Sequence, residues 1–225
     1  MQQCEETISW WKGIMNIFFP IQCLACKQEK KHQWLCESCS KKVLHDAFFP
    51  KQSWIEGGSL DSFLFLYQYS HPTIQAIIHA YKYQFLTDLE STLSKMLHEK
   101  KDTIGKWKAS GIVVPIPLHP RKLRQRGYNQ SFILATTLAS ILEMPLDNNV
   151  LGRKKYTFPQ ARLSKDEREN NMQDVFSLKK EEKEIENNNY ILVDDVFSTG
   201  ATMNDAAKIL KKAGAKKVYG FVLAG

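Results

Sequence analysis

The sequence predicts an α/β protein, a parallel sheet flanked by helices with a small metal-binding module before it. Three observations carry this prediction. From residue 111 onward, short apolar segments alternate with segments of helical periodicity, which is typical of a parallel sheet covered on both faces. Four of the five cysteines fall between Cys23 and Cys39. No apolar run is long enough to cross a bilayer, so no transmembrane segment is expected.

We divide the 225 residues into three parts. Residues 1–50 form a zinc-binding module with a leading helix, because apolar residues recur at helical spacing between Ile8 and Phe19. Residues 51–110 supply a connecting strand and helices, and residues 111–225 form the sheet domain. The chain begins with an acidic pair instead of the cationic segment of a secretory signal. Together with the clustered cysteines, this indicates a reducing, cytoplasmic setting.

The cysteine spacing C-x2-C-x9-C-x2-C predicts a zinc site. Its ligands are Cys23, Cys26, Cys36 and Cys39, two metal knuckles that close on one tetrahedral ion. Four thiolates leave no open position, so the zinc is structural. A redox dithiol pair and unbonded core cysteines are the alternatives, but a redox motif needs only one C-x-x-C beside a βαβ unit. The sequence assigns no role to Cys4.

The middle of the chain predicts one strand and two helices. Aromatic and polar residues partly alternate over Leu60–Tyr69, which favours a strand. Apolar residues have helical spacing over Thr73–Tyr83 and Leu86–Leu97. The charged segment Glu99–Ser110 is interpreted as a loop. No chemistry is assigned to this region.

The sheet domain begins with a buried strand at residues 112–117, which prolines interrupt. A helix follows at residues 128–142, then a buried strand at residues 190–193. The chain continues with a helix at residues 201–212, ended by Gly214, and a strand at residues 217–223. Sheets of this kind bind ligands beyond the carboxyl ends of their strands.

The segment Ile191–Thr202 places chemistry at such an end. Asp194 and Asp195 follow an apolar strand, where paired carboxylates can bind the hydroxyls of a ribose. The small residues Ser198–Thr202 allow backbone N–H groups to surround a phosphate at the start of a helix. The alternative is an ordinary strand-to-helix turn with an acidic N-cap, which accounts for single residues but not for the ordered set.

This segment resembles the phosphoribosyl-pyrophosphate (PRPP) signature of type I phosphoribosyltransferases, an apolar strand, two acids and then Thr-Gly-x-Thr. The resemblance implies that residues 111–225 are a phosphoribosyltransferase-like domain. It implies that Asp194 and Asp195 are catalytic and hold the ribose hydroxyls, and that Mg²⁺ accompanies PRPP. The implied PRPP and phosphate contacts are Asp194, Asp195, Val196, Phe197, Ser198, Thr199, Gly200, Ala201 and Thr202.

A second resemblance covers nearly the whole chain. The segments Pro115–Arg121 and Arg124–Gln130, a block from Arg153 to Phe176 and the four-cysteine module are similar to those of the competence protein F (ComF) family. The resemblance implies a role in DNA uptake during natural transformation, with other competence proteins as possible partners. It also implies a mobile loop at Thr157–Arg168. Candidate residues for the pyrophosphate and the mobile loop are Arg121, Arg124, Arg126, Arg162 and Arg168.

Three functions are open at this stage, and the net charge of +7 suits the anionic ligands of all three. The first is a phosphoribosyltransferase with an unknown acceptor, whose binding surface residues 60–110 could supply. The second is a single-stranded DNA binding component without turnover, in which Trp34, Trp54 and Tyr128 stack on bases. The third is a regulator that senses PRPP or a nucleotide. No general base is assigned, and His119 is interpreted as incidental.

Overall fold

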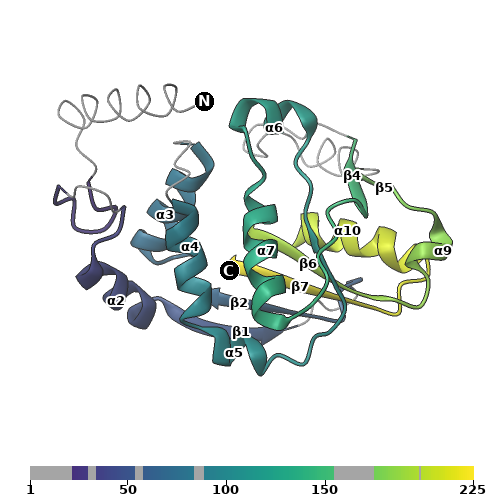
Figure 1. Cartoon of the computed structure of the whole chain (residues 1–225), viewed down its shortest axis with the longest axis horizontal. Coiled ribbons are helices and arrows are strands. Elements are labelled where there is room, and N and C mark those ends of the chain that lie inside the picture. The colour runs from purple at the N-terminus through teal and green to yellow at the C-terminus, as the bar shows by residue number, and fades with distance from the viewer. Residues whose placement is uncertain (1–21, 30–33, 54–57, 84–88, 155–174, 198) are drawn as a thin grey trace, which may run out of the picture.

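The computed structural model describes residues 22–29, 34–53, 58–83, 89–154, 175–197 and 199–225 (Figure 1). The expected leading helix at Ile8–Phe19 and the expected mobile loop at Thr157–Arg168 lie outside these ranges. In chain order the elements are α2 (Glu37–Asp46), β1 (Phe48–Ser53), β2 (Ser62–Tyr67), α3 (Pro72–Tyr83), α4 (Leu89–His98), α5 (Lys101–Gly105), β3 (Ile112–Pro115), α6 (Pro120–Arg126), α7 (Gln130–Leu142), β4 (Leu151–Arg153), β5 (Phe176–Leu178), α9 (Glu182–Ile185), β6 (Asn189–Val196), α10 (Ala201–Lys212) and β7 (Lys217–Ala224).

A five-stranded sheet in the order β1-β2-β7-β6-β3 organises the molecule. The pairs β2–β7, β7–β6 and β6–β3 are parallel, and β1 adds an antiparallel edge. The sheet takes two strands from the segment before residue 110 and three from the segment after it. A separate antiparallel pair, β4 and β5, flanks α10.

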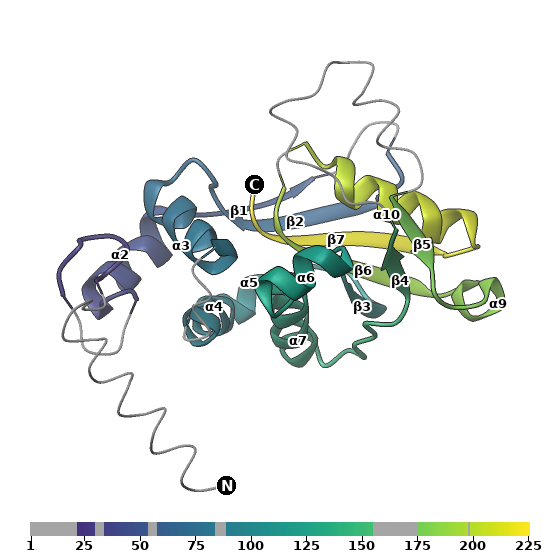
Figure 2. The same ribbon diagram turned by 90° about the horizontal axis from the view of Figure 1, so that it is seen from above.

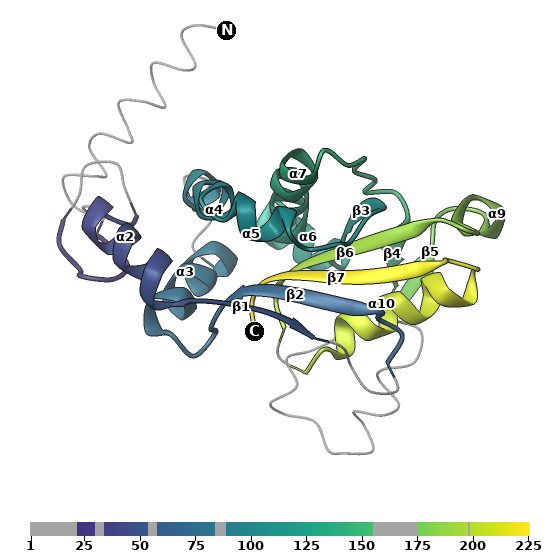
Figure 3. The ribbon, with the colours of Figure 1, turned by 90° about the horizontal axis from the view of Figure 1, so that it is seen from below.

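Helices cover both faces of the sheet, as Figures 2 and 3 show for α7 and α10 on opposite sides. The side chains of successive β6 residues point alternately to the two faces of the sheet, as in any strand. Ile191 and Val193 pack with residues of α3, α4 and α7, whereas Tyr190 and Leu192 pack with residues of α10. Each face therefore has its own apolar core, and β6 is buried on both sides, as a central parallel strand should be.

A glycine lets α10 lie close to the sheet. A Cβ built on Gly220 of β7 would stand 2.4 Å from the sulfur of Met203 in α10 and 3.1 Å from Cβ of Phe63 in β2. A larger residue would push α10 away from the sheet. Because a short loop alone separates the end of β6 from α10, this packing also fixes where the start of the helix lies relative to the aspartate pair.

The predicted α/β architecture is confirmed, with differences in the first half. The segment expected to be a loop at Glu99–Ser110 contains the short helix α5, so that prediction is wrong. The reason is packing, because Ile104 and Trp107 are buried in the core that α7 covers. Within the described ranges, no helix combines the length and the apolarity needed to span a membrane.

Candidate functional site

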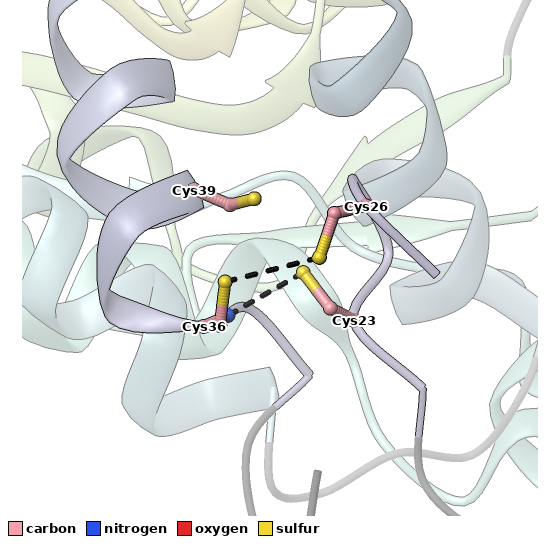
Figure 4. A group of neighbouring side chains, drawn as sticks. All are labelled: Cys23, Cys26, Cys36 and Cys39. Carbon is pink, nitrogen blue, oxygen red and sulfur yellow. Dashed lines mark hydrogen bonds between the residues drawn. The ribbon is translucent and has the colours of Figure 1, made fainter. Parts of the chain in front are cut away.

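The four clustered cysteines converge in space, from two differently built segments (Figure 4). Cys23 and Cys26 lie on a tight turn, in which Lys27 N–H donates to the Cys23 carbonyl at 2.9 Å and Lys27 has a positive φ of 61°. Cys36 is the N-cap of α2, and Cys39 lies in its first turn. The second pair thus uses a helix start in place of the second knuckle that the spacing predicted.

The geometry of this cluster fits a metal ion. All four Sγ atoms lie within 4.8 Å of one another, and Cys26 Sγ and Cys36 Sγ are 4.0 Å apart. A tetrahedral ion with metal–sulfur bonds of about 2.3 Å requires sulfur atoms about 3.8 Å apart. The sulfur atoms therefore need only a small contraction to hold one ion.

The pKa values of the thiols in the cluster also favour a bound cation. Burial raises the pKa of the Cys23 thiol, but backbone N–H groups of Cys36, Cys26 and Ala25 outweigh it and lower the pKa to about 6. The hydrogen bond from Cys36 N–H to Cys23 Sγ measures 3.4 Å. The hydrogen bond to Cys36 and burial raise the pKa of Cys39 to about 12. Neighbouring thiols thus cannot all ionise unless a positive ion joins them.

The second candidate site lies where β6 ends, at the two predicted aspartates. Asp194 Oδ1 accepts hydrogen bonds from Ser131 Oγ at 2.8 Å and from Asp195 N–H at 2.9 Å. Asp195 Oδ2 pairs with Lys82 Nζ at 3.0 Å, and the Asp195 side chain is only 8% exposed. Among the described residues, Asp194 Oδ2 and Asp195 Oδ1 make no hydrogen bond or ion pair. Each carboxylate is therefore fixed by one oxygen and keeps the other for a ligand.

Asp194 and Asp195 line a pocket of about 180 Å³, so the contact between Asp195 and Lys82 leaves room for a ligand. Four of its lining side chains are cations, and the two aspartates are its acids. Its lining residues are Lys82, Ile116, Leu118, Lys122, Arg126, Gln130, Ser131, Arg153, Asp194, Asp195 and Thr202. The pocket thus offers hydrogen-bond acceptors on one wall within a positively charged surrounding, which suits a hydroxylated anion.

Burial and neighbouring charges shift the pKa values of three side chains in this pocket. Burial, followed by the neighbouring charge of Asp195, raises the pKa of Asp194 to about 6. Burial alone would lower the pKa of Lys82, but the charges of Asp195 and Asp194 raise it above its usual value. Burial lowers the pKa of Lys122, and so do three neighbouring cations, of which Arg153 has the largest effect. The shifts at Asp194 and Lys82 thus reflect the paired carboxylates, whereas the shift at Lys122 reflects neighbouring cations, so an anionic group of a ligand is favoured near Lys122.

The predicted phosphate loop follows β6 and leads into α10. Gly200 is the N-cap of α10 with φ of 74°, a left-handed conformation that glycine adopts without strain. Thr199 Oγ1 accepts from Ala201 N–H at 3.4 Å, and Thr202 reaches the pocket. Phe197 instead stacks on Phe63, with ring centroids 4.3 Å apart. Ser198 lies outside the described residues, and Val196 packs against the core on the α7 side.

A larger pocket of about 540 Å³ adjoins the first, and the two share Leu118 and Arg153. Apolar residues of the β3–α6 connection form much of it, together with the exposed side chains of Leu123 in α6 and Phe132 in α7. Lys154 and Lys179 add positive charge from the β4–β5 pair. The two pockets form one basic region along the carboxyl end of β3.

The structure separates the five candidate arginines. Arg126 lines the smaller pocket and Arg124 the larger one, whereas Arg121 lines neither. Arg162 and Arg168 lie outside the described residues. His119 caps α6 by accepting from Arg121 N–H at 3.2 Å.

Among the charged and hydroxyl side chains that line the smaller pocket, four had no assigned role in the sequence analysis, namely Lys82, Lys122, Ser131 and Arg153. Lys122 lies between the candidates Arg121 and Arg124, and Arg153 begins the block that resembles the ComF family, but neither signal assigned a role. Lys82 lies more than a hundred residues before Asp195, so no local pattern could have linked the two.

Two of the three candidate stacking aromatics serve the fold. Trp34 packs against the core on the α7 side. Tyr128 packs on Tyr81, with ring centroids 5.6 Å apart, and its hydroxyl donates to the Tyr81 carbonyl. Trp54 lies outside the described residues.

Comparison with known proteins agrees with this geometry. A family model described as a phosphoribosyl transferase domain matches residues 129–224. Competence protein F of Haemophilus influenzae is 29% identical over 217 residues, which are 95% of this chain and 94% of that protein. DNA utilization protein YhgH of Escherichia coli is 30% identical over 152 residues, which are 65% of each chain.

Competence protein ComFC of Bacillus subtilis is 34% identical over 151 residues, which are 65% of this chain and 52% of that protein. The chain thus covers less than two thirds of the length of the last two relatives and nearly all of the first. The match over residues 129–224 includes both aspartates and α10. With the cysteine cluster and the parallel sheet, these findings show that the chain is similar over nearly its whole length to competence protein F and that residues 129–224 match a phosphoribosyl transferase domain.

Proposed function

We propose that this protein binds PRPP or another ribose 5-phosphate compound at the carboxyl end of β6 and that it serves DNA uptake in natural transformation. One observation carries the binding proposal. Asp194 and Asp195 are each anchored by one oxygen, and each keeps the other without a partner among the described residues. Two such acceptors side by side suit the vicinal hydroxyls of a ribose.

The rest of the ligand follows from the surroundings of this pair. The 5′-phosphate lies at residues Ser198–Thr202, where the start of α10 favours an anion. The pyrophosphate extends toward Arg126, Lys122 and Arg153, which line the same pocket. Guanidinium groups bind phosphate oxygens through two parallel hydrogen bonds, so Arg126 is the first candidate for this contact.

The reaction that this arrangement supports is transfer of the phosphoribosyl group. An acceptor attacks the anomeric carbon, the bond from that carbon to the pyrophosphate oxygen breaks, and pyrophosphate leaves with the electron pair. The protein's part is to orient the ribose through Asp194 and Asp195 and to stabilise the departing charge through the cations. Residues 60–110 contribute Lys82 of α3 to the aspartate pair, and the acceptor-binding surface expected from this segment stays a prediction.

Two metals belong to the proposal. Zinc is the occupant of the cysteine cluster, because four thiolates in tetrahedral reach suit it and leave no open position for catalysis. Mg²⁺ accompanies PRPP, since phosphate oxygens and water supply most of its preferred ligands. When bound, it neutralises charge on the pyrophosphate.

The role in DNA uptake is supported by the relatives, of which two are named as competence proteins and one as a DNA utilization protein. Other competence proteins are the corresponding partners. We also propose a cytoplasmic location, which four cysteines close together without a disulfide support.

Isothermal titration calorimetry with ribose 5-phosphate and with PRPP tests the binding proposal. Both compounds are expected to bind the wild-type protein, and an Asp194→Asn, Asp195→Asn double variant is expected to bind each at least about tenfold more weakly. The matched control is Asp147→Asn, which changes an aspartate that lines neither pocket. No heat of binding with either compound would refute the proposal.

A titration with single-stranded DNA at two salt concentrations, using the same variants, separates the functions that the sequence left open. Binding of DNA that the double variant retains, without binding of ribose 5-phosphate, would favour a DNA-binding component without turnover. Release of pyrophosphate in the presence of an acceptor would distinguish an enzyme from a sensor.

A further inference from the structure

The acidic pair already has a cation beside it, supplied by the protein. Lys82 Nζ lies 3.0 Å from Asp195 Oδ2, and the two side chains are 26% and 8% exposed. Lys82 belongs to the last turn of α3, outside the segment that matches the phosphoribosyltransferase model. The first half of the chain thus contributes a charge to a site whose signature lies in the second half.

This contact matters because two adjacent carboxylates repel an anionic ligand. A divalent cation commonly removes such repulsion in sites that bind phosphates. In this pocket four cations already surround the two acids, and one of them is held directly by Asp195. A metal ion at Asp195 Oδ2 would have to displace this ammonium group, whose side chain is 26% exposed, so at that oxygen the lysine occupies the place that a divalent ion would take.

We propose that Lys82 is a positioning residue that neutralises the aspartate pair in place of a divalent cation, so that the ribose 5-phosphate part of the ligand binds without metal. This inference rests on the proposed function of the same site. Mg²⁺ that arrives on the pyrophosphate of PRPP is a separate matter, and ribose 5-phosphate, which lacks the pyrophosphate, isolates the effect of Lys82.

Lys82 also orients the carboxylate of Asp195. Its bond to Oδ2 turns Asp195 so that Oδ1 remains for the ligand, while Ser131 holds Oδ1 of Asp194 in the same way. Loss of Lys82 would leave Asp195 buried without its counter-charge, which is costly for a carboxylate. A metal ion could then take the vacated place.

The test is calorimetry of ribose 5-phosphate binding to the full chain, in EDTA and in millimolar Mg²⁺. The wild-type protein is expected to bind equally in both buffers. Lys82→Met is expected to bind about tenfold or more weakly in EDTA and to regain affinity in Mg²⁺. Lys82→Arg, which keeps the charge, is expected to stay close to wild type in EDTA.

Lys180→Met is the matched control, because Lys180 is similarly exposed at 30%, pairs with Asp147 at 2.7 Å and lines neither pocket. It should leave binding unchanged in both buffers, and thermal melting of each variant shows whether it folds. Wild-type binding that requires Mg²⁺, or equal affinities of Lys82→Met and wild type in EDTA, would overturn the inference. No binding of ribose 5-phosphate or PRPP to the wild type in either buffer would instead refute the proposed function itself.

Discussion

Asp194 should cost the protein stability at neutral pH, and removing its charge should therefore stabilise the fold while weakening ligand binding. The usual pKa of an aspartate is 3.8, and burial together with Asp195 raises that of Asp194 to about 6. A difference of this size corresponds to about 3 kcal/mol between the ionised and neutral forms. Asparagine keeps an oxygen that can accept from Ser131 Oγ and from Asp195 N–H, so Asp194→Asn removes the charge and preserves these contacts.

The sign of the pH dependence follows from the raised value. Between pH 4 and 6, approximately, the folded protein binds more protons at Asp194 than the unfolded chain does. The contribution of Asp194 to stability should therefore fall as the pH rises through this window and stay constant above it. Asp194→Asn should match wild type near pH 4 and exceed it by about 2 to 3 kcal/mol at pH 7.

Urea unfolding at pH 4, 5, 6 and 7 measures this difference. Asp147→Asn is a control for which the opposite change in stability is expected. Burial raises the pKa of Asp147, but Lys180 and the Asn149 N–H outweigh burial and lower it. That variant should be less stable than wild type at pH 7. If Asp194→Asn is destabilised equally at pH 4 and pH 7, the carboxylate is an ordinary structural partner and the reasoning is wrong.

Three further predictions address the other parts of the structure. Replacing Cys36 and Cys39 by serine should remove a metal that amounts to one zinc per chain in the wild type and should lower the melting temperature; metal analysis that finds no zinc in reduced wild-type protein would contradict this. Arg126→Met should weaken PRPP binding by about tenfold and ribose 5-phosphate binding less, whereas Arg121→Met, outside both pockets, should change neither in calorimetry. Gly111→Ala should destabilise the protein by about 2 kcal/mol or more in urea unfolding, because Gly111 has φ of 147° and a Cβ there would lie 2.2 Å from the Asn189 carbonyl oxygen; an unchanged midpoint would contradict it.

Local patterns in the sequence predicted the elements that form the site. The apolar run before Asp194 predicted β6, and the periodicity after Gly200 predicted α10, because both signals lie within a few residues of the structure they specify. The cysteine spacing predicted the cluster for the same reason. It did not predict that Cys36 caps a helix, since the following residues are polar and charged and give little helical periodicity.

What the sequence could not show depends on contacts between distant segments. The pairing of Lys82 with Asp195 requires α3 to pack beside the end of β6, and no local pattern encodes that meeting. The helix α5 was missed because its charged residues conceal Ile104, which is buried only once the core has formed. Tyr128 is a candidate for stacking on bases from the sequence, but its ring packs on that of Tyr81, which is far away in sequence.

A crystal structure with ribose 5-phosphate soaked in tests the central claim most directly. We predict density for the phosphate at the start of α10 and for the two ribose hydroxyls at Asp194 Oδ2 and Asp195 Oδ1, with the Lys82 contact to Asp195 retained. A sugar phosphate bound elsewhere, or a pocket that stays empty at saturating ligand while the aspartates keep their present contacts, would contradict the account.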